Sequence, residues 1–288
     1  MKPYRVDQLT DKYIEYDMIQ RHTDLPAQPD SRARLLAVFL ERSSLQQNQE
    51  ELYALSTSLV QMAMDTHDLI DVAKENRPES DMRSRQLKVL AGDYFSSRFY
   101  QLLAQAGQID AISRLSEAVC EVNARKMSLY KAMTSSWMQA ETYLREMVQL
   151  KMQLFLSFSS LMNDDDLRIW ELLLEEFSRS ETLAGELDAV GKPADSLFSY
   201  TRWIIMEQGS QEEQGKLAGG MMNQQEWDKL VAKYAVGHQI REQLQRSVDR
   251  IEVLVRDIHG SEGQAELLQA IRPYTVLLHA SHSVVREG

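Results

Sequence analysis

Apolar residues recur three and four positions apart along most of the chain, which is the spacing of helices that bury one face. The longest clear run covers 47–72. Its spaced apolar positions are Leu52, Leu55, Leu59, then Met62 or Ala63, and then Leu69 or Ile70. This pattern predicts a long amphipathic helix over 47–72.

The same spacing predicts further helices on both sides of this one. One begins after Asp30 and Ser31, which are residue types that cap helix N-termini. The others cover about 85–106, 110–133, 137–162 and 224–258. Gly107 and Gly260 follow two of these helices and are expected to end them. The polar residues over 74–85 predict a loop.

Residues that break helices are rare in this sequence. It has 12 glycines and 6 prolines among 288 residues, whereas a strand-rich fold needs turn residues every ~8–12 positions. Inside a helix, Gly and Pro cost about 1 and 3 kcal/mol, so their scarcity favours an all-α fold. Nine of the glycines lie over 185–263, where the pattern defines helix boundaries least well.

The predicted connections between helices are short, which favours one compact helical bundle. Residues 1–30 contain three of the six prolines, and they predict a loosely attached N-terminal arm with a short helix. The remaining residues, 31–288, are then expected to form a single all-α domain.

The composition limits the classes of function and the cellular compartment that we expect for the protein. Lys and Arg total 32 and Asp and Glu total 43, so the net charge is −11, which disfavours binding to nucleic acid or anionic lipid. The single cysteine, Cys120, excludes an intramolecular disulfide and suits a cytoplasmic protein. The N-terminus has no apolar signal-peptide core, and no apolar run approaches the ~20 residues of a transmembrane helix.

Common catalytic and nucleotide-binding motifs are missing. The sequence has no Gly-x-Ser-x-Gly, P-loop, Gly-x-Gly-x-x-Gly or His-Glu-x-x-His pattern. Cys120 lies among apolar residues and is expected to be a buried, inert thiol. His279 and His282 share a spacing of three, but we interpret them as surface residues. The aspartates over 163–166 suit the N-terminus of a helix better than a cation site.

One segment carries a spacing that chemistry can use. Asp65, Asp68 and Asp71 are three residues apart on the predicted helix, so they form one slanting stripe of carboxylates. Such a stripe can hold magnesium against a diphosphate. The alternative is a polar face near a helix C-terminus, where carboxylates oppose the helix dipole.

A second segment, 85–95, reads RQLKVLAGDYF. Gly92 lies in the middle of the predicted helix at a cost of about 1 kcal/mol relative to Ala. A helix accepts that cost where a neighbouring backbone must approach closely. Gly92, Asp93 and Tyr94 are therefore a candidate helix contact.

The segments 58–68 (SLVQMAMDTHD) and 85–95 together resemble trans-prenyl diphosphate synthases, and 121–130 resembles one branch of them. In those enzymes a first Asp-Asp-x-x-Asp motif follows a His at the end of one helix, and a Val-Leu-Ala-Gly-Asp-Tyr run opens the next. The likeness is closer to one branch, the small, non-catalytic subunit (component 1) of heterodimeric heptaprenyl diphosphate synthases. It is strong over about 55–130.

The resemblance implies the isoprenoid-synthase fold and an accessory subunit with no catalytic residues of its own. In that family, component 1 pairs with a component 2 chain that carries both aspartate-rich motifs. The pair extends farnesyl diphosphate with isopentenyl diphosphate toward the menaquinone side chain. The resemblance thus implies a heterodimer that shares the prenyl diphosphate substrate and product, with Mg²⁺ in the partner and no cofactor on this chain.

The sequence departs from the active synthases in a way that supports this interpretation. Where they read His-Asp-Asp-x-x-Asp, this chain reads His67, Asp68, Leu69, Ile70 and Asp71, which is one carboxylate short. The second Asp-Asp-x-x-Asp is missing, and the acidic stretch over 188–195 has the wrong spacing. A complete active site on this chain is therefore not expected, because magnesium must neutralise the leaving diphosphate.

The resemblance also suggests roles for particular residues. A remnant diphosphate site is expected at Asp65, His67, Asp68, Asp71 and Arg85. The helix that follows offers a candidate wall for a product tunnel, formed by Phe95, Phe99 and Leu103, although these could equally be core residues. Two other functions stay open: a self-sufficient isoprenoid enzyme with degenerate motifs, and a helical scaffold protein without lipid chemistry.

Overall fold

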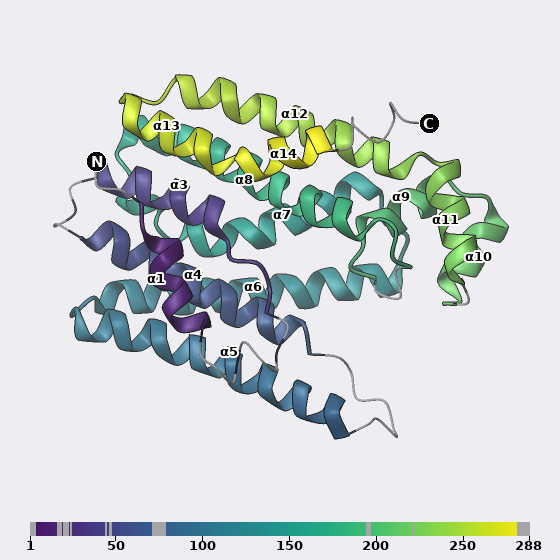
Figure 1. The fold of residues 1–288 in the computed structure, drawn as a ribbon, viewed down its shortest axis with the longest axis horizontal. Coiled ribbons are helices and arrows are strands. Elements are labelled where there is room, and N and C mark those ends of the chain that lie inside the picture. Colours follow the sequence, from purple (N-terminus) through teal and green to yellow (C-terminus); the bar gives the residue numbers. More distant parts are fainter. Residues whose placement is uncertain are drawn as a thin grey trace. The chain divides into compact units, whose positions relative to one another are not determined.

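Helices account for the regular structure in the computed structural model (Figure 1). The structure describes residues 4–15, 19, 23, 25–43, 45, 48–70, 79–193, 197–220 and 222–280. No strand occurs in these ranges, so the predicted all-α fold class is confirmed. The contacts of the chain divide it into two compact units: Met1–Val119 with Leu154–Trp170 and His259–Ala270, and the remaining residues. The predicted single domain over 31–288 stays a prediction.

The first unit is built around α4, which packs against α5 along its length and also against α3 and α1 (Figure 1). The last of its helices, α13, packs on α3. The elements that lie wholly in this unit are α1 (Val6–Ile14), α3 (Asp30–Glu41), α4 (Gln49–Asp68), α5 (Glu79–Gln105), the 3-10 helix η1 (Ser159–Leu161) and α13 (Ser261–Ala270).

The second unit contains the remaining helices. In it α12 packs against α14, α9 and α11, and α10 packs on α9. Its own elements are α9 (Tyr200–Gln208), α10 (Gln211–Ala218), α11 (Gln224–Lys233), α12 (Val236–Arg256) and α14 (Arg272–Ala280). Three helices supply residues to both units: α6 (Ile109–Ser135), α7 (Ala140–Leu156) and α8 (Asp164–Ala189).

Burial of α4 on nearly all sides explains its composition. Every residue from 53 to 64 is buried, including several hydroxyl side chains. The hydroxyls of Thr57, Ser58 and Thr66 donate to the carbonyl oxygen four residues earlier, at 2.8, 2.9 and 2.6 Å. These bonds satisfy polar atoms that would otherwise destabilise the core. The helix predicted over 47–72 is thus confirmed over Gln49–Asp68, but it ends earlier than predicted, since Leu69 and Ile70 are not helical.

The start of α5 differs from the prediction, whereas its end does not. The helix begins at Glu79, inside the predicted loop, because its first turn is acidic and Glu79 pairs with Arg83 at 2.6 Å. Its end agrees with the prediction. Gly107 has φ of +70°, and the next residue, Gln108, donates its N–H to the carbonyl oxygen of Leu103 at 2.8 Å.

The helix predicted over 224–258 is two helices, α11 and α12, so that prediction was wrong. Ala235 between them has φ of +46°. The contacts of α11 explain the break: the indole of Trp227 donates to the carbonyl oxygen of Val190 at 2.9 Å, and Tyr234 donates its hydroxyl to Glu213 at 2.7 Å. These tertiary contacts override the continuous apolar spacing.

Two smaller expectations also differ from the structure. The helix predicted over 137–162 ends at Leu156, and η1 follows it. Within the expected loose arm, α1 is packed: Val6 and Thr10 are buried, and Asp7 lies 3.5 Å from Arg34. The short helix was predicted, but the apolar residues that fix it in place were not.

Candidate functional site

The two segments that carry the family resemblance meet in the first unit, at the C-terminal turn of α4 and the middle of α5. The ring of His67 lies on the backbone of Gly92. A Cβ at Gly92 would lie only 2.5 Å from Nε2 of His67. The same nitrogen lies 3.6 Å from Oδ1 of Asp93, and both side chains are partly exposed. Gly92 therefore admits an imidazole ring where any larger residue would clash with it.

The other residues of the expected diphosphate site have different surroundings. Asp65 is half-buried, and its Oδ1 accepts a hydrogen bond from the amide of Gln61 at 2.8 Å. Asp68 and Arg85 are exposed, at the end of α4 and on α5. Asp71 lies outside the described residues. The structure thus brings His67, Gly92 and Asp93 together, and the diphosphate role of this set stays a prediction.

The candidate tunnel residues form the inner face of α5. Phe95, Phe99 and Leu103 are at most 3% exposed and belong to the core of the first unit. Tyr94 is partly exposed and lies under the guanidinium of Arg98, 4.9 Å from the ring centre. Burial is compatible with a tunnel wall and with a plain core, so the tunnel role also stays a prediction.

A buried arginine near this site was missed by sequence reasoning. Arg32 on α3 is 0% exposed, and its Nη1 donates to Oε1 of Gln61 at 3.1 Å. Its guanidinium also lies 4.7 Å from the ring centre of Phe155. Since Gln61 in turn donates to Asp65, the three polar residues form a chain of hydrogen bonds from α3 to the end of α4. The available signal was the spacing of Arg32 to Leu35, Leu36 and Phe39, which places it on the buried face.

The second unit contains a cavity of about 460 Å³ between α7, α8 and the segment that leads into α9. Met147 and Phe198 contribute apolar walls, and Lys151 and Glu181 form an ion pair of 2.8 Å at its lining. Glu186 also lines it. Burial raises the pKa of the Glu186 carboxyl from 4.5 to about 7, although hydrogen bonds from the backbone N–H groups of Tyr200 and Thr201 lower it.

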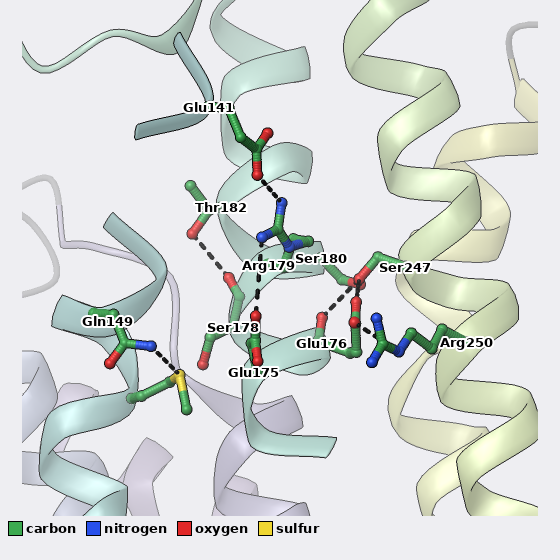
Figure 2. Close-up of polar contacts among 11 residues, drawn as sticks. Glu141, Gln149, Glu175, Glu176, Ser178, Arg179, Ser180, Thr182, Ser247 and Arg250 are labelled. Atoms are coloured by element: carbon green, nitrogen blue, oxygen red, sulfur yellow. Dashed lines mark hydrogen bonds and ion pairs between the residues drawn. The ribbon is translucent and has the colours of Figure 1, made fainter. Parts of the chain in front are cut away.

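A second buried carboxyl lies on the same helix. Figure 2 shows Glu176 on α8 facing α12, where the hydroxyl of Ser247 donates to it at 2.7 Å and Arg250 lies 3.2 Å away. Burial raises the pKa of Glu176, and the partners on α12 lower it less. This cluster ties α8 to α12. Glu176 and Ser247 are buried and Arg250 covers them from the exposed side, which is typical of a structural contact.

The remaining sequence expectations have plain outcomes. The aspartates over 163–166 do begin α8, and Asp166 pairs with Arg42 at 2.5 Å. Cys120 is exposed on α6, so the prediction of a buried thiol was wrong: its neighbours are apolar in sequence, but it lies on the outer face of the helix. His282 lies outside the described residues. No described helix is long and apolar enough to cross a membrane.

Solved prenyl diphosphate synthases share this fold. A heptaprenyl diphosphate synthase from Staphylococcus aureus has a TM-score of 0.69 at 14% identity, covering 94% of this chain and 95% of that one. A decaprenyl diphosphate synthase from Rhodobacter capsulatus has a TM-score of 0.67 at 12% identity, covering 95% of both chains. The protein thus has the all-α fold of the isoprenoid synthases.

The sequence comparisons identify one family among the proteins that share this fold. Residues 16–248 match the family model described as heptaprenyl diphosphate synthase (HEPPP synthase) subunit 1, and the chain belongs to this family. A curated relative, heptaprenyl diphosphate synthase component 1 from Geobacillus stearothermophilus, is 38% identical over 92 residues. That match spans 32% of this chain and 40% of the relative. The resemblance found in the sequence is confirmed.

The contact between His67 and Gly92 predicts a strong coupling between two substitutions. In a His67→Ala background, Gly92→Ala should raise the free energy of unfolding by about 1 kcal/mol, since Ala favours the helix and the clash is gone. In the wild-type background the new Cβ forces the ring away, and this gain should be lost or reversed. Urea unfolding of the four proteins measures the coupling. Equal effects in both backgrounds would contradict the contact.

Proposed function

We propose that this chain is the accessory subunit of a heterodimeric heptaprenyl diphosphate synthase. Its partner is a catalytic component 2 chain that bears both aspartate-rich motifs and binds Mg²⁺. The pair extends farnesyl diphosphate with isopentenyl diphosphate, and the product serves menaquinone side-chain synthesis. The observation that carries the proposal is membership of the subunit 1 family over 16–248, in a chain whose first aspartate motif is one carboxylate short.

The described donor atoms at the end of α4 support our assignment of magnesium to the partner. Magnesium takes oxygen ligands in near-octahedral geometry, usually from carboxylates and water. Here one oxygen of Asp65 is bonded to Gln61, and an imidazole occupies the place beside Gly92. No group of three or more His, Cys, Asp or Glu in the described ranges is placed to hold a metal ion. We therefore assign the metal-dependent step to the partner.

The contact of His67 with Gly92 also separates the proposal from the scaffold alternative. A scaffold without lipid chemistry gives no reason for the segment around His67 to pair with the segment around Gly92. The two lie in contact, and this pairing supports the proposal. A self-sufficient enzyme is disfavoured by the eroded first motif and the missing second one.

The partner surface that we propose is the outer face of α5. Leu90 is 61% exposed, and Met82, Val89 and Tyr100 on the same helix are also exposed large apolar residues. Apolar side chains gathered on one helix are typical of a surface that a second protein covers. This places the interface on the helix whose inner face carries the candidate tunnel wall.

Association with the catalytic chain tests this proposal. We expect tagged chain to copurify with a component 2 chain as a heterodimer, and Leu90→Asp to weaken the complex at least tenfold, because a buried carboxylate without a partner is costly. The measurement is the dissociation constant by light scattering or calorimetry.

The matched control is Val253→Asp, which changes an apolar residue that is 57% exposed on α12. It should bind like the wild type. Failure of the wild-type chain to bind component 2 would overturn the proposed function. Wild-type affinity of Leu90→Asp would instead move the interface away from α5.

A further inference from the structure

Glu186 is the one carboxyl of the described cavity lining that reaches into the start of another helix. It lies near the C-terminal end of α8, and its Oε1 accepts the backbone N–H of Tyr200 at 2.8 Å. Tyr200 is the first residue of α9, and the N–H of Thr201 is also directed at the carboxylate. The first backbone N–H groups of a helix have no acceptor within the helix. Glu186 supplies an acceptor for two of these N–H groups and so holds the start of α9.

The charges around Glu186 do not neutralise it. On α7, Lys151 pairs with Glu181 of α8 at 2.8 Å. Arg179 of α8 pairs with Glu141 of α7 and with Glu175, as Figure 2 shows. Lys192 is exposed at the cavity edge. Within the described ranges no cation forms an ion pair with Glu186, so its charge, when present, is balanced only by backbone dipoles.

The helices packed around this carboxyl link it to the rest of the unit. The ring of Tyr143 on α7 stacks on Tyr200, with 6.4 Å between ring centres. The hydroxyl of Tyr143 is buried and has no hydrogen-bond partner among the described residues. Burial raises the pKa of Tyr143, and the charge of Glu186 raises it further. On α12, Gln243 donates to the hydroxyl of Tyr200 at 2.6 Å. A change at Glu186 therefore bears on the contacts of α9 with α7 and α12.

We propose that Glu186 is a pH-dependent switch, which we call a catch. When Glu186 is protonated, it stays buried and holds the first turn of α9 against α8 at the cavity wall. When Glu186 is ionised, it favours an open state in which water reaches the carboxylate. The catch changes the wall of this solvent-open cavity and goes beyond the subunit role proposed above. The catch needs no bound ligand. Its closed and open states differ only in the solvation of the Glu186 carboxyl and in the hydrogen bonds that this carboxyl accepts from backbone N–H groups.

The direction follows from the pKa of Glu186, which is about 7 when buried and 4.5 when solvated. The closed state binds the proton more tightly, so acid favours it and a rise in pH favours the open state. The change occurs between about pH 4.5 and pH 7, and it is complete above the higher value. The ratio of closed to open molecules should fall by at most about 300-fold over that range.

Hydrogen exchange of the purified full chain tests the catch. We expect the protection factors of the Tyr200 and Thr201 amides, which are corrected for intrinsic base catalysis, to fall at least tenfold between about pH 5 and pH 8. Glu186→Gln keeps an oxygen that accepts the N–H groups and cannot ionise, so its protection should not depend on pH. Glu175→Gln, a partly exposed position on the same helix, should keep the wild-type profile.

Two results would overturn the proposal. One is wild-type protection at Tyr200 and Thr201 that does not change with pH, and the other is the same fall in Glu186→Gln as in the wild type. Carbon-13 titration of the wild-type glutamate carboxyls adds a test that does not depend on any variant. A Glu186 midpoint near 4.5 would also refute the catch, whereas a midpoint near 7 supports it.

Discussion

The purified chain alone should transfer no prenyl group from farnesyl diphosphate to isopentenyl diphosphate in the presence of magnesium, and addition of component 2 should restore turnover. The expected difference is at least about 100-fold, because ionisation of the allylic diphosphate needs a metal cage to neutralise its charge. On this chain the first motif is one carboxylate short, and His67 occupies the space beside Gly92. The assay is incorporation of labelled isopentenyl diphosphate into extracted polyprenols.

The surface variants make this prediction specific. Leu90→Asp should fail to restore turnover at concentrations where Val253→Asp restores it fully, if the complex is the active species. Turnover by the isolated chain, after removal of contaminating synthase, would refute the accessory role. Equal activity of component 2 with and without this chain would refute it as well.

The second large effect concerns stability. Arg32→Ala should lower the free energy of unfolding by about 3–5 kcal/mol, since it leaves Gln61 Oε1 without this donor and opens a void against Phe155. Arg32→Met should cost much less, because an apolar side chain of similar length fills the space and buries no charge. Urea unfolding with coincident fluorescence and circular dichroism transitions measures both.

The control for this series is Arg83→Ala. Arg83 forms an ion pair on an exposed surface of α5, with 73% of its side chain exposed, and its loss should change stability by less than about 0.5 kcal/mol. An Arg32→Ala protein within about 1 kcal/mol of the wild type would show that the buried hydrogen-bond chain contributes little. Such a result would also remove the reason for the position of Asp65.

Periodicity and resemblance predicted the parts of the molecule that depend on local sequence. The cores of α4 and α5 and the end at Gly107 follow from apolar spacing and from a C-terminal glycine. The glycine inside a helix predicted a close approach at Gly92, but the neighbour is the His67 side chain and not the expected backbone. The two segments of the candidate site were identified because their residue types occur together in one family. Local residue identity was sufficient for these features.

The features that escaped prediction depend on contacts between distant segments. The break at Ala235 arises from contacts of α11 with Val190 and Glu213. In the sequence, the continuous apolar spacing across 233–237 is a stronger signal for one helix than any local residue is for a break. In the sequence Glu186 is an ordinary helix carboxylate, and only its burial in the folded unit raises its pKa. The apolar neighbours of Cys120 in the sequence predict a core residue, whereas the packing of α6 leaves Cys120 on the exposed face.

The exposure of Cys120 gives the protein a single site for thiol-specific labelling. The chain has one thiol, and that thiol is accessible on α6. A maleimide dye therefore attaches once per molecule at a known place, with no cysteine substitutions. Stepwise photobleaching of such a dye counts copies of this subunit in each assembled particle, and energy transfer to a labelled partner reports on assembly as it happens.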